Sequence, residues 1–134
     1  MVGITGSYIY YMKNSSSFRK AGMVSVWVGH FKSPDQLDEY MNLTSGFEDD
    51  FGFTLDEKDV REATVEVLSK SIDQLADGFS AFESFVGNVA EAATRAGIRS
   101  ATTMLVCYGF EFDPSRVAVN DAAPLRFLGA FPFS

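Results

Sequence analysis

The sequence predicts an α+β fold in which a mostly antiparallel sheet of about four strands packs against two main helices. Three observations favour this fold. Residues 23–31 alternate with the period of a strand, residues 81–96 carry apolar side chains at helical spacing, and residues 101–112 hold an apolar run. The order of strand, helix, strand, helix, strand and strand is typical of an antiparallel sheet covered by helices.

The first strand and the helix after it carry clear local signals. Alternation along residues 23–31 places three valines on one face of the strand: Val24, Val26 and Val28. Trp27 should therefore lie on the opposite face and pack under a helix. Ser33 is the expected N-cap of the next helix, with Pro34 at its first position and Gln36 completing a capping box. The buried stripe of this helix should hold three residues: Leu37, Tyr40 and Met41.

Shorter elements are expected in the middle of the chain. Phe47 and Phe51 are four residues apart, which allows one helical turn that Gly52 would end. Residues 64–68 alternate as a strand does, and residues 72–76 can form a helical turn.

The longest helix should span residues 81–96. Ser80 and Glu83 fit a capping box at its start. Gly97 fits the glycine that follows a helix C-terminus, and Ile98 can fold back onto the last turn.

Two further strands should complete the sheet. Neither face of residues 101–112 is polar, so this strand should be buried on both sides. Residues 125–133 should form the last strand. Pro132 has no amide hydrogen, which places this strand at a sheet edge or leading out of the sheet.

The start of the chain differs in composition from the rest. The stretch from Asn14 to Gly22 is polar, small and basic, as linkers are. We expect residues 1–22 to form an N-terminal arm outside the core, in which residues 8–12 are able to add a strand to a sheet edge. The remaining residues, 23–134, should form a single domain with one core.

Acidic residues are concentrated in one part of the chain. Residues 35–62 hold ten acidic residues against Lys58 and Arg61, which is a formal charge of −8, and the whole chain carries −7. This potential repels phosphate backbones and attracts basic protein surfaces, so we expect a protein partner and no nucleic acid. A solvated acidic face without a partner is the alternative. The candidate partner-binding residues are the central acids of this stretch: Glu48, Asp49, Asp50, Asp56, Glu57 and Asp59.

Residue types that serve catalysis and metal binding are scarce. The sequence has one histidine, His30, and one cysteine, Cys107, which form neither a multi-cysteine metal site nor a disulfide within the chain. His30 should be an ordinary residue at a strand end, and the apolar neighbours of Cys107 should suppress its thiolate. Glycine-rich phosphate loops and the GxSxG elbow are missing from the sequence. We therefore predict no catalytic residue, no metal, no cofactor and no enzyme activity.

The sequence also lacks the signs of export or membrane insertion. No apolar stretch approaches the ~18 residues that a membrane span needs, and the N-terminus does not have the pattern of a signal peptide. We expect a cytoplasmic protein that does not bind membranes. The oligomeric state is left open.

Several motifs resemble the bacterial family known as immunity protein 22. That family opens with a strand carrying a Trp-x-Gly element, followed by a capped helix that ends in Tyr. The matching residues here are Trp27, Gly29 and Tyr40. The middle stretch FEDDFGF and the closing stretch FLGAFPF resemble two further elements of the family.

The resemblance covers roughly residues 23–131, with only a loose match over residues 54–98. It implies an immunity protein that binds and neutralises the cognate toxin of a polymorphic toxin system. Many such toxins are nucleases with basic active-site faces, which an acidic inhibitor would suit. Two alternatives stay open: an enzyme or small-ligand pocket around Trp27 and His30, and an adaptor domain with no toxin partner.

Overall fold

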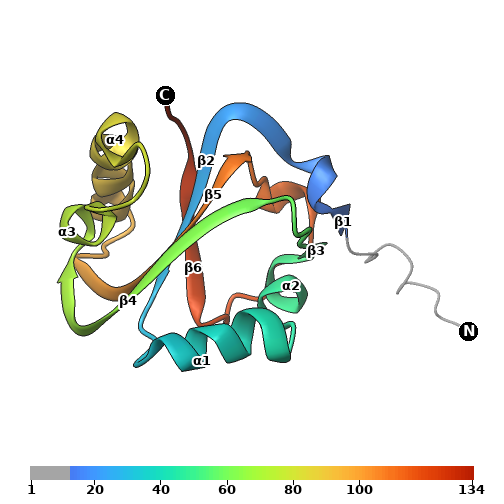
Figure 1. Cartoon of the computed structure of the whole chain (residues 1–134), viewed down its shortest axis with the longest axis horizontal. Helices are drawn as coiled ribbons and strands as arrows, with labels where there is room; N and C mark the ends of the chain where they lie inside the picture. Colours follow the sequence, from blue (N-terminus) through green and yellow to red (C-terminus); the bar gives the residue numbers. More distant parts are fainter. Residues whose placement is uncertain (1–12) are drawn as a thin grey trace, which may run out of the picture.

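The computed structural model describes residues 13–134, and its centre is a four-stranded antiparallel sheet (Figure 1). The strand order is β4-β5-β2-β6, and the strands are β2 (Arg19–Gly29), β4 (Val60–Ser71), β5 (Ser100–Phe110) and β6 (Leu125–Pro132). A separate parallel pair joins β1 (Lys13–Asn14) to β3 (Phe53–Thr54). The predicted α+β class with its antiparallel sheet is confirmed.

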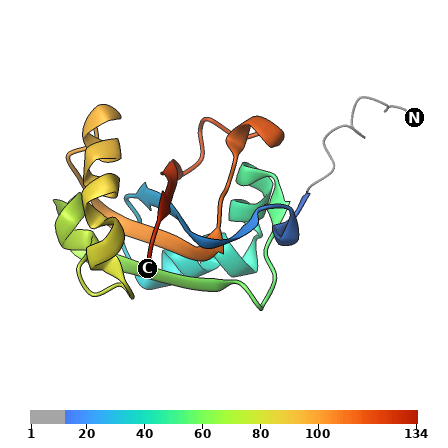
Figure 2. The same ribbon diagram turned by 90° about the horizontal axis from the view of Figure 1, so that it is seen from above.

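Helices cover both faces of this sheet (Figure 1, Figure 2). One face carries α3 (Ile72–Ala76) and α4 (Phe82–Arg95). The other carries α1 (Pro34–Asp38), which continues directly into the π-helical η3 (Glu39–Leu43), and then α2 (Gly46–Phe51). Single 3-10 turns lie between β1 and β2, at η2 (Ser15–Ser17), and between β5 and β6, at η4 (Pro114–Arg116). The two main helices that the sequence predicts are thus the α1–η3 helix and α4.

The alternation along β2 divides the core into two clusters. Its three valines pack under α3 and α4 with residues that are mostly aliphatic; we call this side the valine face. Trp27 points to the opposite side, where its ring centroid lies 5.1 Å from Phe47 and 5.1 Å from Phe127. This side, the aromatic face, holds eight phenylalanines besides Trp27 that are buried or half-buried, and α1, η3 and α2 cover it. The predicted burial of Trp27 opposite the valines is confirmed.

Local signals explain most helix ends. Ser33 Oγ accepts the backbone N–H of Gln36 at 3.2 Å, and Pro34 begins α1, both as predicted. The Gln36 side chain, however, accepts from the backbone of Lys32 rather than from Ser33, so the capping box is incomplete.

Two glycines end helices where the sequence predicts. Gly52 follows α2 with a φ of 75°, in the left-handed region that favours glycine. Gly97 follows α4 with the same φ, and the backbone N–H of Ile98 donates to the Ala93 carbonyl at 2.8 Å. This bond is the six-residue closure of a Schellman motif, which satisfies a carbonyl at the helix end.

The start of α4 differs from the prediction. Its N-cap is Ala81, with a φ of 59° and no side-chain cap, so the capping box from Ser80 to Glu83 is not formed. Instead, the Ser80 hydroxyl donates to Glu62 on β4 at 2.6 Å. The Ser80 side chain therefore makes a tertiary contact with β4 instead of capping α4.

Residues 13–22 belong to the fold. Phe18 is 2% exposed, and its ring centroid lies 5.2 Å from that of Phe112 on the aromatic face. The backbone N–H of Lys13 donates to Gly52, and β2 already begins at Arg19. The expectation that residues up to 22 lie outside the core is therefore corrected for residues 13–22, because Phe18 has an apolar ring that the core buries. Residues 1–12, which include the candidate strand at 8–12, lie outside the described residues.

The other three strands of the sheet lie where the sequence predicts them, and β4 is longer than predicted. β4 contains the predicted residues 64–68, and β5 is buried on both faces because each face contributes side chains to one of the two core clusters. β6 lies at an edge of the sheet, as Pro132 suggests. In the part of the chain described, no helix is long and apolar enough to cross a membrane.

Candidate partner-binding surfaces

The acidic stretch lies on short elements that are fixed to the aromatic face. Its six central acids lie on α2 and in the turn between β3 and β4. Phe47, Phe51 and Phe53 are each 1% exposed and anchor it from below. Since helices of one or two turns are unstable alone, these three rings set where the carboxylates lie.

Asp50 is engaged within the fold. Its Oδ2 accepts the hydroxyl of Tyr40 at 2.7 Å, and its Oδ1 accepts the side-chain amide of Asn120 at 2.9 Å. Burial, followed by the hydrogen bond and charge of Asp50, raises the pKa of Tyr40. Asp50 therefore ties α2 to η3 and to the loop before β6.

Asp56 and Asp59 are paired with a basic residue from the start of β2. The Asp59 side chain is 2% exposed, and its Oδ1 lies 3.3 Å from Arg19 Nη2; Asp56 Oδ2 lies 3.5 Å from the same nitrogen. The backbone N–H of Lys58, and then the charge of Arg19, holds the pKa of Asp56 below its usual value. Part of the sequence's acidic charge is thus neutralised inside the molecule.

The other three acids divide into one bonded residue and two free ones. Glu48 Oε2 accepts the backbone N–H of Leu55 at 2.6 Å. Asp49 and Glu57 are exposed and, with residues 13–134 as possible partners, form no side-chain hydrogen bond or ion pair. A role of all six acids in partner binding stays a prediction, and these two are the residues whose carboxylates are open to a partner.

The residues singled out for chemistry lie apart from one another. His30 is exposed just beyond β2, while Cys107 is buried in β5. Burial, followed by the charge of Asp59, raises the pKa of the Cys107 thiol to about 12, which suppresses the thiolate. Trp27 is fully buried, and its Nε1 has no hydrogen-bond partner among the described residues. Across residues 13–134, no group of three or more His, Cys, Asp and Glu is placed to hold a metal ion.

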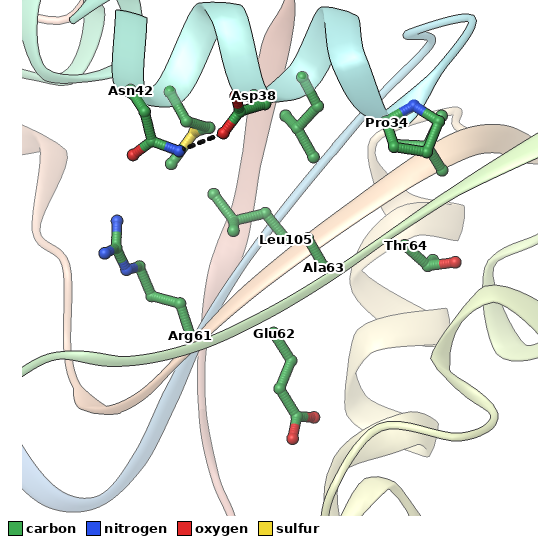
Figure 3. A pocket seen from close by; sticks show the side chains of 11 residues that line it. Pro34, Asp38, Asn42, Arg61, Glu62, Ala63, Thr64 and Leu105 are labelled. Atoms are coloured by element: carbon green, nitrogen blue, oxygen red, sulfur yellow. Dashed lines mark hydrogen bonds between the residues drawn. The ribbon is translucent and has the colours of Figure 1, made fainter.

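A groove that sequence reasoning missed lies between the α1–η3 helix and β4 (Figure 3). Its volume is about 560 Å³. Leu37 and Met41 line it from the helix, and Ala63 and Leu105 line it from the sheet. At its rim the Asn42 amide donates to Asp38 at 2.7 Å.

Two neighbouring charges of β4 point to opposite sides of the sheet. Figure 3 shows the Arg61 side chain reaching toward the helix and the Glu62 side chain pointing away from it. Strand alternation is the sequence signal that could have predicted which β4 side chains face the groove, because it places Arg61, Ala63 and Val65 on the aromatic side.

Glu62 is occupied on the other side. Its Oε1 accepts the backbone N–H of Ser80 at 2.8 Å and the hydroxyl of Tyr108 at 3.0 Å. Burial raises the pKa of the Glu62 carboxyl, but the hydrogen bonds from Ser80 and Tyr108 outweigh it and hold the pKa below its usual value. Glu62 therefore fixes the loop before α4 to β4.

Comparison with known proteins gives one family. Residues 24–134 match the family described as Immunity protein 22. This confirms the resemblance that the strand, helix and C-terminal motifs predict. No significant match was found among curated proteins or among solved structures.

Proposed function

We propose that this chain, which belongs to the immunity protein 22 family, binds a cognate toxin of a bacterial polymorphic toxin system and so neutralises it. The family match over residues 24–134 is the observation that carries the proposal. The proposed activity is binding, not catalysis. We place it in the cytoplasm, where a single unpaired Cys107 stays reduced.

The acidic stretch supports a basic partner such as a nuclease with a basic active-site face. The chain carries a net charge of −7, and residues 35–62 carry −8 of formal charge. A field of one sign steers an oppositely charged protein and raises the rate of association. Asp49 and Glu57 would face the toxin directly, because their carboxylates are exposed and unbonded within the described part of the chain.

The bonded acids would act differently in the proposed complex. Asp50, Asp56 and Asp59 hold the stretch together through Tyr40 and Arg19, so they contribute to the field while fixing its shape. The proposal therefore assigns direct contact to two residues and positioning to the others.

Co-purification with the toxin encoded beside this chain's gene tests the proposal. A stable complex with loss of toxin activity is the expected result. Failure of the folded chain to bind that toxin would contradict it.

The acidic mechanism has a separate test with a matched control. Asp49→Asn with Glu57→Gln should slow association with the toxin, and added salt should shrink the difference because the screening length falls to about 8 Å near physiological ionic strength. Asp73→Asn with Glu83→Gln removes the same charge from exposed positions of α3 and α4, across the sheet. Equal slowing by both double variants would show that only net charge matters and would refute a specific role for the acidic stretch.

Small-ligand binding is the second candidate, and the groove is the observation that favours it. Its volume of about 560 Å³ falls within the roughly 300–1,000 Å³ of ligand pockets. An adaptor role without a toxin is the related alternative. A chain that fails to bind the neighbouring toxin would favour these readings over immunity.

A further inference from the structure

The two edge strands of the sheet are protected to different degrees. β6 is eight residues long, ends at Pro132 and contains Gly129 with a φ of 148°. β4 is twelve residues long and contains neither proline nor glycine. A free edge presents backbone N–H and C=O groups to which another strand can bind, and proline and irregular backbone are common defences against such pairing. Residues 60–65 of β4, which pair regularly with β5 before the strand bulges, are therefore the edge that is open to an added strand.

Most of the exposed large apolar side chains lie on β4. Four large hydrophobic side chains are exposed in residues 13–134: Leu43 74%, Val60 61%, Val67 92% and Leu68 75%. Three of these lie on β4, and Leu43 ends η3, whose preceding residues Met41 and Asn42 line the groove. Val67 and Leu68 are adjacent and form one apolar patch, whereas Val60 lies at the other end of the strand. Adjacent exposed apolar residues mark an interaction surface, whereas scattered ones need no explanation.

The exposure of Val67 and Leu68 follows from a large bulge. Val65 pairs with Thr103 and Lys70 pairs with Ala101, so residues 66–69 of β4 leave the ladder. Lys70 Nζ bonds Glu66 Oε1 at 2.9 Å across the bulge. This ion pair holds the bulge, which turns the side chains of Val67 and Leu68 outward.

The groove beside β4 adds a charge without a partner. The Arg61 side chain lines the groove and, within the described residues, forms no ion pair. A guanidinium binds a carboxylate through two parallel hydrogen bonds, so this position suits an acidic side chain of a partner. The π-helical η3 forms the opposite wall, and π-helical turns often occur at functional sites.

We propose that the free edge of β4 and the groove beside it are the docking surface for an extended segment of the toxin, an inference that rests on the proposed function. The segment pairs with β4 as an added strand, contacts Val67 and Leu68 with apolar side chains, and places a carboxylate at Arg61. A second copy of this chain suits the surface less well, because each copy carries a net charge of −7 and two copies repel. The acidic stretch would speed the encounter, and the β4 edge would slow dissociation.

Dissociation kinetics with the cognate toxin test the docking surface. Val67→Ser with Leu68→Ser, and separately Arg61→Gln, should each make dissociation about tenfold faster, as loss of a strong interface contact does. The side chains of Val67 and Leu68 are both exposed, so the melting temperature of the double variant should not change. Asn88→Ser, exposed on α4 across the sheet, is the control that should leave the dissociation rate unchanged.

Hydrogen exchange of the full chain gives the second measurement. The amides of residues 60–71 that do not already bond β5 should become protected when toxin binds, while those of α4 should not change. Unchanged dissociation of the variants and unprotected β4 amides, in a complex that still forms, would overturn the docking surface and leave the immunity role standing. Absence of any complex with the unchanged chain would overturn both.

Two other occupants would also contradict the inference. Protection of residues 60–71 in a free dimer would assign the edge to a second copy. Protection in the free monomer that disappears when the chain begins at Lys13 would assign it to residues 1–12.

Discussion

The two faces of the sheet are built from different side chains and covered in different ways. Under α3 and α4 the core is mainly valine, alanine and other aliphatic residues, and its principal cover is one helix of fourteen residues. Under α1, η3 and α2 the core is mainly aromatic, and its cover is the α1–η3 helix, whose second half is π-helical, and the six-residue α2. Helices this short are unstable without tertiary contacts, so the aromatic rings must hold them.

This difference separates what stabilises the molecule from what presents a surface. The aromatic face positions the acidic stretch, because Phe47, Phe51 and Phe53 anchor it. The valine face positions α4, which carries no predicted partner residue. Damage to the aromatic face should therefore disturb both stability and toxin binding, whereas damage to the valine face should disturb stability alone.

The largest expected effect comes from removing the start of β2. A chain that begins at Met23 loses Phe18 and the Arg19 pairs with Asp56 and Asp59. Loss of a buried Phe side chain alone costs about 3–5 kcal/mol, so the free energy of unfolding should fall by at least this much. Denaturant unfolding measures it, and a shortened chain as stable as the full one would show that Phe18 contributes nothing to the aromatic face.

Trp27→Ala should cost about 3–5 kcal/mol of unfolding free energy, because the side chain is fully buried between α2 and the sheet. Folded molecules of this variant should also bind the toxin more weakly, since Phe47 and Phe51 lose their support. Val89→Ala, at an equally buried site of the valine face, should lower stability without changing binding by folded molecules. A Trp27→Ala variant that melts like the unchanged chain and loses only binding would place Trp27 in the interface.

Neighbouring acids of the same helix should respond differently. Asp50→Asn removes the charged carboxylate that accepts hydrogen bonds from Tyr40 and Asn120. The free energy of unfolding should fall by about 1.5 kcal/mol. Asp49→Asn changes an exposed, unbonded side chain and should stay within about 0.5 kcal/mol of the unchanged chain. Thermal unfolding of the two variants measures the difference, and equal stabilities would mean that the Asp50 contacts do not hold α2 in place.

The smallest effect concerns the valine side of β4 in acid. The pKa of Glu62 is lowered in the folded chain, so its stabilisation is present above the unfolded value of about 4.3 and is lost as pH falls through the lower folded pKa. Glu62→Gln should therefore be less stable near neutrality and should lose less stability below about pH 4.3. Melting temperature against pH measures this, and parallel curves for the two chains would contradict it.

Local signals predicted the elements but not the contacts between distant residues. The glycines after α2 and α4 and the alternation around Trp27 are features of neighbouring residues, and the structure confirms them. The pairing of Arg19 with Asp59 joins residues forty positions apart, so the sequence could show the acidic charge but not its neutralisation. For the same reason the local pattern predicts Ser80 as a helix cap, whereas its hydroxyl donates to the distant Glu62.

The candidate site was predicted only in part for a similar reason. Composition identified the acidic stretch, but not that, of the six candidate acids, only Asp49 and Glu57 remain unbonded in the part of the chain described. The β4 edge gave no sequence signal, since the order of strands and the bulge at residues 66–69 depend on pairing with β5. Burial and pairing are properties of the folded chain, which periodicity alone does not contain.

Titration of the purified neighbouring toxin with the purified full chain tests the central claim most directly. The toxin's activity is measured at each concentration of this protein, with the Trp27→Ala variant as a comparison. Activity should fall to background as the complex saturates, and the variant should require a higher concentration. Full toxin activity at saturating concentrations of the folded chain would contradict the account.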